Sequence, residues 1–149
     1  MARSDSDPAV TEATAAFELA GALVEADDLA AAEANYGSAD RLGHPAAASN
    51  LGVLLERRGD VAGAEAAYRR ADERGDATGA FNLGSLLSEQ GDLDAAESAF
   101  GRAAQRGSAE AALNLGLLMQ SRGDLTGATA AFRRADELGD PEQTDRAHA

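Results

Sequence analysis

Apolar and polar residues follow each other along the chain with the period of an α-helix, in short stretches that are separated by glycine. Between residues 47 and 58 the apolar positions share one face of a helix. These positions are Ala47, Ala48, Leu51, Leu54 and Leu55. The spacing therefore predicts an amphipathic helix over this stretch.

A second helical stretch follows at once, over about Val61 to Arg74. Gly59 can adopt the left-handed conformation that ends the first helix, and Asp60 is a preferred N-cap for the second. Gly75 and Asp76 repeat the same two signals at its far end. The sequence thus predicts an antiparallel helix pair joined by a Gly-Asp corner.

This pattern recurs at a fixed step of thirty-two residues. The columns filled in all four copies include Leu19, Leu51, Leu83 and Leu115, then Tyr36, Tyr68, Phe100 and Phe132, then Gly43, Gly75, Gly107 and Gly139. A period in this range is typical of a solenoid of stacked helix pairs. We expect an all-α solenoid of four helix-turn-helix repeats, at about 13–44, 45–76, 77–108 and 109–140.

Both ends of the repeat array carry capping signals. Asp7-Pro8 places an N-cap before a proline at the first helical position, so the first helix should run from Pro8 to about Ala26. Asp140-Pro141 repeats the signal before a short capping helix within 141–149. We expect residues 1–149 to form a single domain.

Glycine recurs in the first helix of three copies, at Gly52, Gly84 and Gly116. A glycine inside a helix costs about 1 kcal/mol relative to alanine. Three such glycines in register predict a backbone contact that is too close for a methyl group.

The chain resembles the tetratricopeptide repeat. Leu51-Gly52 is followed by Leu55, and Ala64 and Tyr68 lie four residues apart in the second helix, as in that pattern. The pattern's leading Trp and final Pro are missing, and the junction between pairs is similar to the Sel-one-like variant of the superfamily. The resemblance implies a right-handed superhelix whose first helices line a concave groove, in scaffold or adaptor proteins without chemistry of their own.

A helical wheel identifies the flank of each first helix that should face this groove. The flank carries Asn50, Val53 and Arg57 in the second copy, Asn82, Ser85 and Glu89 in the third, and Asn114, Leu117 and Ser121 in the fourth. The column Asn50, Asn82 and Asn114 predicts a peptide-binding ladder, because an amide can pair with any peptide unit. The alternative is that each Asn bonds the neighbouring helix and fixes the repeat spacing.

Two apolar residues lie beside this column. Phe81 and Leu113 could form a pocket for an anchor residue of a partner. The alternative is that they only fill space between repeats.

The composition of the chain limits the chemical class of the partner. The net charge is −13, and all 13 basic residues are arginine. Nucleic acid binding requires the opposite sign. An acidic peptide tail is disfavoured because Arg57 is the only base on the mapped flank. We expect a neutral to basic protein segment as partner.

The composition also indicates the cellular location and the kind of organism. The chain has no Cys and no apolar stretch long enough to cross a bilayer. Its polar N-terminal residues lead us to expect no secretory signal. The absence of lysine and isoleucine suggests a GC-rich bacterial genome. We expect a monomeric bacterial protein of the cytoplasm with no membrane partner.

Catalysis is not indicated. The two histidines, His44 and His148, have no spacing typical of a metal site or of a nucleophile and its base. We expect no enzyme activity, no cofactor and no metal. The alternatives to a free-standing adaptor are a regulatory module of a larger system and a self-assembling structural solenoid.

Overall fold

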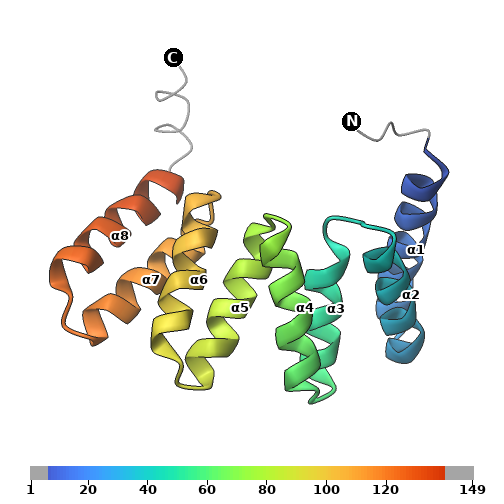
Figure 1. The fold of residues 1–149 in the computed structure, drawn as a ribbon, viewed down its shortest axis with the longest axis horizontal. Coiled ribbons are helices and arrows are strands. Elements are labelled where there is room, and N and C mark those ends of the chain that lie inside the picture. Colours follow the sequence, from blue (N-terminus) through green and yellow to red (C-terminus); the bar gives the residue numbers. More distant parts are fainter. Residues whose placement is uncertain (1–6, 140–149) are drawn as a thin grey trace. The chain divides into compact units, whose positions relative to one another are not determined.

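The computed structural model describes residues 7–139, and this part of the chain consists of α-helices and short turns (Figure 1). The helices are α1 (Pro8–Glu25), α2 (Leu29–Arg41), α3 (Ala47–Arg57), α4 (Val61–Glu73), α5 (Ala77–Glu89), α6 (Leu93–Gln105), α7 (Ala109–Ser121) and α8 (Leu125–Gly139). The prediction of an all-α helical-repeat solenoid is confirmed. The expected capping helix within 141–149 lies outside the described residues.

The chain divides into two compact units, Met1–Arg74 and Gly75–Ala149. Unit 1 contains the hairpins α1/α2 and α3/α4, and unit 2 contains α5/α6 and α7/α8 (Figure 1). Inside each unit one further junction packs the two hairpins together, α2 on α3 in unit 1 and α6 on α7 in unit 2. The single domain over 1–149 stays a prediction.

The corners inside the hairpins form as the sequence predicts. Gly59 has a φ of 87°, in the left-handed region that glycine tolerates best, and the Asp60 side chain accepts a hydrogen bond from the Gly63 amide at 2.9 Å. In the first hairpin Asp27 takes the glycine position with a φ of 61°. Asp is among the few residues that enter this region at modest cost.

The mid-helix glycines make room for a ring. A Cβ at Gly84 would lie 2.7 Å from Phe100 Cδ1, and one at Gly116 would lie 2.6 Å from Phe132 Cδ1. Gly52 faces the Tyr68 ring in the same way. The close contact is therefore with an aromatic side chain of the second helix, and the predicted backbone contact is wrong. The sequence pattern shows the small residue but does not show what fills the space.

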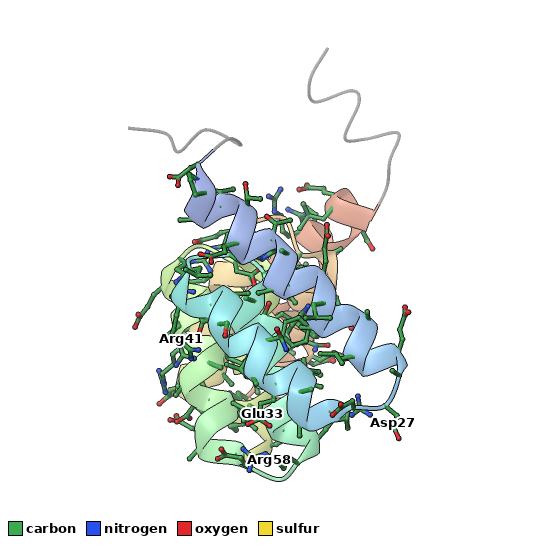
Figure 2. All side chains as sticks on the ribbon, turned by 90° about the vertical axis from the view of Figure 1, so that its right-hand side faces the viewer. Asp27, Glu33, Arg41 and Arg58 are labelled. Atoms are coloured by element: carbon green, nitrogen blue, oxygen red, sulfur yellow. The ribbon has the colours of Figure 1, made fainter. Side chains whose placement is uncertain are left out.

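Ion pairs join the hairpins of unit 1. The half-exposed Arg58 makes a two-pronged contact with Glu33, with Nε and Nη2 donating to the two carboxylate oxygens at 3.1 and 2.9 Å (Figure 2). The carboxylate of Asp40 is buried, and both oxygens accept hydrogen bonds: Oδ2 from Arg70 in α4 and Oδ1 from Arg74, the C-cap of α4. These contacts link α2 to both helices of the second hairpin.

Candidate functional site

The predicted asparagine column lies on first helices in both units. Asn50 belongs to α3, Asn82 to α5 and Asn114 to α7, and all three are half-buried. Across residues 7–139 the structure gives none of these three amide side chains a hydrogen bond. Their donors and acceptors are thus available to another molecule.

A hollow of about 430 Å³ opens in unit 2 between the C-terminal halves of α5 and α7. Its lining consists of Ser85, Ser88, Glu89, Phe100, Asn114, Leu117, Leu118 and Ser121. Five of these eight residues belong to the flank that the helical wheel identified: Ser85, Glu89, Asn114, Leu117 and Ser121. The predicted flanks of α5 and α7 therefore meet at one surface.

The lining divides into an apolar and a polar part. Phe100 and Leu118 are buried, whereas Leu117 is 51% exposed at the edge. Two serines use their hydroxyl protons inside their own helices: Ser85 Oγ donates to the Phe81 carbonyl at 3.2 Å and Ser121 Oγ donates to the Leu118 carbonyl at 2.7 Å. These two hydroxyl oxygens can therefore still accept hydrogen bonds, but they have no proton left to donate.

The other predicted residues of unit 2 lie outside this lining. Phe81 packs against Phe100, with ring centroids 5.9 Å apart and planes tilted by 50°. Leu113 is 45% exposed on α7. Neither residue lines the hollow, so the anchor pocket predicted from Phe81 and Leu113 stays a prediction.

In unit 1 the predicted residues are surface positions of α3. Val53 is 40% exposed and Arg57 is exposed beside it on the same flank. Unit 1 also contains a cluster of rings that was not predicted from the sequence. His44 stacks on Phe17 with ring centroids 4.0 Å apart, and Phe17 also contacts Tyr36 at 5.5 Å. Partial burial lowers the pKa of His44 from its ordinary value of 6.5.

Ser88, Phe100 and Leu118 also went unpredicted as lining residues. Ser88 lies one position before Glu89 in α5, and Phe100 was recognised only as a repeat column. The signal that could have found Ser88 is its place three residues after Ser85 on the helix surface.

Two kinds of feature are missing from the part of the chain that the structure describes. No group of three or more His, Cys, Asp or Glu side chains there could hold a metal ion. No helix there has the length and apolar character needed to span a membrane.

The repeat, the Gly-Asp corners and the ring packed on a mid-helix glycine define a helical-repeat protein of the tetratricopeptide type. A family model of the tetratricopeptide repeat matches residues 17–79 and 81–142. The chain belongs to the tetratricopeptide repeat family. Membership supports a role as a protein-interaction scaffold. No curated protein matches the sequence.

Solved structures share the fold. A structure of MamA matches with a TM-score of 0.69 at 19% identity, over 97% of this chain and 85% of that one. YrrB, a tetratricopeptide repeat protein with an unusual peptide-binding site, matches with a TM-score of 0.61 at 24% identity, over 91% and 74%. A tetratricopeptide repeat protein from Parabacteroides merdae ATCC 43184 matches with a TM-score of 0.68 at 23% identity, over 83% and 52%.

Proposed function

We propose that this protein is a scaffold that binds an extended segment of a partner protein along the first helices of its repeats. The observation that carries the proposal is the hollow between α5 and α7, whose lining includes Ser85, Glu89, Asn114 and Leu117. These residues were selected from the helical wheel alone, and they line one concave surface. Concavity with a few polar groups among apolar ones is typical of binding sites.

The asparagine side chains supply the second argument. Asn82 and Asn114 keep both amide donors and the amide oxygen uncommitted within residues 7–139. Buried or half-buried polar groups normally find a partner. A peptide backbone offers donors and acceptors at every residue, so two amides could hold an extended segment whatever its sequence. YrrB, which shares the fold, is described as having a peptide-binding site.

The charge of the chain supports a neutral to basic segment. The net charge is −13, and Glu89 is an exposed member of the lining. An acidic segment would meet repulsion at this surface, whereas a basic one would be attracted. We propose further that this is a monomeric bacterial protein of the cytoplasm. Its repeat is a thirty-two-residue variant, and the junction between its helix pairs is similar to the Sel-one-like variant of the superfamily.

The test is a selection from a displayed random peptide library. We expect the wild-type protein to enrich neutral to basic sequences. We expect Asn82→Ala with Asn114→Ala to weaken their binding about thirtyfold, through two lost hydrogen bonds of about 1 kcal/mol each. The melting temperature should be unchanged because neither amide has a hydrogen bond within the described part of the chain.

Two results would contradict the proposal. One is the enrichment of no peptide above background. The other is equal binding of the enriched peptides by wild type and by the double variant. Preferential enrichment of acidic peptides would overturn the charge preference alone. Sedimentation at several concentrations tests the monomer, and a mass that rises with concentration would favour the self-assembling alternative.

A further inference from the structure

We infer that the hollow between α5 and α7 binds the positively charged side chain of an arginine or lysine in the partner segment. The inference rests on the proposed function and assigns a chemistry to its central surface. Four features of the described residues carry it.

The first feature is that three polar groups of the lining, those of Ser85, Glu89 and Ser121, can only accept hydrogen bonds. Ser85 and Ser121 already donate their protons to backbone carbonyls, at 3.2 and 2.7 Å, so their oxygens retain lone pairs only. The Glu89 carboxylate is an acceptor in its ionised form. A ligand group that fits these positions must be rich in N–H donors, as a guanidinium or ammonium is.

The second feature is an uncompensated negative charge. Glu89 is the last residue of α5, where the helix dipole is negative and disfavours a carboxylate. The last turn of α5 contains no basic residue, and Glu89 forms no ion pair with any residue from 7 to 139. A bound cation would relieve this unfavourable placement.

The third feature is a second helix end on the same hollow. Helix α7 ends at Ser121, and its last turn also lacks a basic residue. The C-cap Arg122 is engaged by two carboxylates, Asp94 at 2.5 Å and Glu97 at 2.8 Å, so its charge is already balanced. The C-terminal turns of both α5 and α7 therefore contribute partial negative charge to one concave surface. The two helix ends and the carboxylate act in the same direction.

The fourth feature is the apolar part of the lining. Phe100 and Leu118 are buried there, and Leu117 is 51% exposed. Arginine and lysine carry an aliphatic stem behind the charge, which packs on apolar surface while the charged end reaches polar groups. The mixture of apolar wall and acceptors thus matches one side chain along its whole length.

Unit 1 provides a natural control, because its residues correspond to those of unit 2 at a step of sixty-four. The positions of Ser85, Ser88 and Ser121 are Gly21, Val24 and Arg57 in unit 1, whereas Glu89 corresponds to Glu25. Unit 1 therefore lacks the hydroxyls and already has an arginine on this flank. We expect it not to bind a cationic side chain.

The probes are acetylated and amidated pentapeptides Ala-Ser-X-Ser-Ala in which X is arginine, lysine, citrulline or glutamate. Citrulline has the shape of arginine without the charge. Binding is followed by amide chemical shifts of the ¹⁵N-labelled full chain. We expect the arginine and lysine peptides to shift the amides at the C-terminal turns of α5 and α7, and the citrulline and glutamate peptides to bind at least tenfold more weakly.

Two variants locate the site. Glu89→Gln should weaken the arginine peptide about three- to tenfold, as expected for one charged hydrogen-bonded contact at a partly exposed site. Ser121→Arg supplies the hollow with an arginine of the chain itself, as unit 1 has, and should abolish detectable binding. Glu25→Gln is the matched control, and it should leave binding unchanged.

The outcomes separate this inference from the proposed function. Equal binding of the arginine and citrulline peptides, or an equal effect of Glu89→Gln and Glu25→Gln, overturns the cation site and leaves the scaffold standing. Stronger binding of the glutamate peptide also overturns it. If no pentapeptide binds at any accessible concentration, the cation site is wrong, and the library selection then decides whether the scaffold proposal fails with it.

Discussion

The two units of this chain have the same helices in the same order, yet they use corresponding positions differently. In unit 1 Asp40 is buried against Arg70 and Arg74. Sixty-four residues later unit 2 has Ala104, Arg134 and Leu138 at the same positions. One unit joins its second helices with charges, and the other has two apolar residues there. The comparison teaches that the repeat fixes the helices, while the contacts between helices are free to diverge.

On the surface near the first helices, it is unit 2 that has the additional polar residues. Unit 2 has serines at positions 85, 88 and 121, where unit 1 has Gly21, Val24 and Arg57. The aromatic column of the second helices differs as well, with Tyr36 and Tyr68 in unit 1 and Phe100 and Phe132 in unit 2. Both units have an ion pair between hairpins, Arg58 with Glu33 and Arg122 with Glu97. Unit 1 in addition buries the Asp40 carboxylate, whereas unit 2 places hydroxyls along the hollow. We interpret this as a division between a unit specialised for internal contacts and one specialised for binding.

The largest expected effect comes from breaking the charged contact of unit 1. Asp40→Ala removes the acceptor of two arginines and should lower the free energy of unfolding by about 3 kcal/mol, at the low end for a buried ion pair because both arginines reach solvent. Urea denaturation measures the loss. Adding Arg74→Leu, which copies the pair Ala104 and Leu138 of unit 2, should recover most of it. A double variant no more stable than Asp40→Ala would show that the two units do not share this geometry.

The sequence could not predict this contact. The corners were predictable because Gly59 and Asp60 act on their own backbone, and the helices begin and end within a residue or two of the expected positions. Asp40 meets residues thirty and thirty-four positions later, and periodicity does not reveal which charged side chains converge after the helices pack. Long-range partners depend on the inclination of one helix to another.

The candidate site could likewise be predicted in part. Once the leucine column fixed the phase of each first helix, the wheel placed Ser85, Glu89, Asn114 and Leu117 on one flank, and all four line the hollow. The depth of the hollow was not predictable, because it depends on where the Phe100 ring lies under Gly84. Which residues face the groove follows from the sequence of a single helix, whereas the depth of the hollow depends on how α5, α6 and α7 pack together.

The next effect concerns the glycines that accept a ring. Gly84→Ala would bring a methyl group within 2.7 Å of Phe100, and we expect a loss of about 2 kcal/mol in thermal unfolding from overpacking, after the gain in helix propensity is subtracted. The first hairpin of unit 1 has Ala20, fully buried, at the corresponding position. Ala20→Gly should therefore cost only about 1 kcal/mol, through propensity and lost contact. Equal losses in the two variants would contradict the assignment of the Gly84 contact.

A smaller effect tests the difference between the aromatic columns. The Tyr68 hydroxyl donates to Glu56 at 2.7 Å, whereas Phe100 and Phe132 have no hydroxyl. Tyr68→Phe gives unit 1 the residue of unit 2, and it should lower stability by about 1 kcal/mol through the lost hydrogen bond. Chemical denaturation provides the measurement, and Tyr36→Phe in the first hairpin is the companion variant. An unchanged stability in Tyr68→Phe would mean that the hydroxyl gains nothing over its hydration in the unfolded chain.

The smallest effect is a dependence of stability on pH. We assign it to unit 1, because His44 is the one histidine among residues 7–139. Its pKa is lowered in the folded state by burial, so the unfolded chain binds a proton more readily. Stability from this group is therefore fully present above the unfolded value, which is 6.5 for an ordinary histidine, and it is lost as the pH falls from there through the folded pKa. His44→Phe keeps a ring against Phe17 and cannot titrate.

The experiment compares the melting temperatures of wild type and His44→Phe between pH 7.5 and pH 5. The wild type should lose more on acidification than the variant, because only the wild type must hold a neutral imidazole against a falling pH. Carboxylates contribute equally to both proteins, so the difference between the two curves isolates His44. A difference in melting temperature that stays constant with pH would contradict the lowered pKa. Hydrogen exchange adds the location: faster exchange at low pH that is confined to amides of α1 and α2 would assign the response to unit 1.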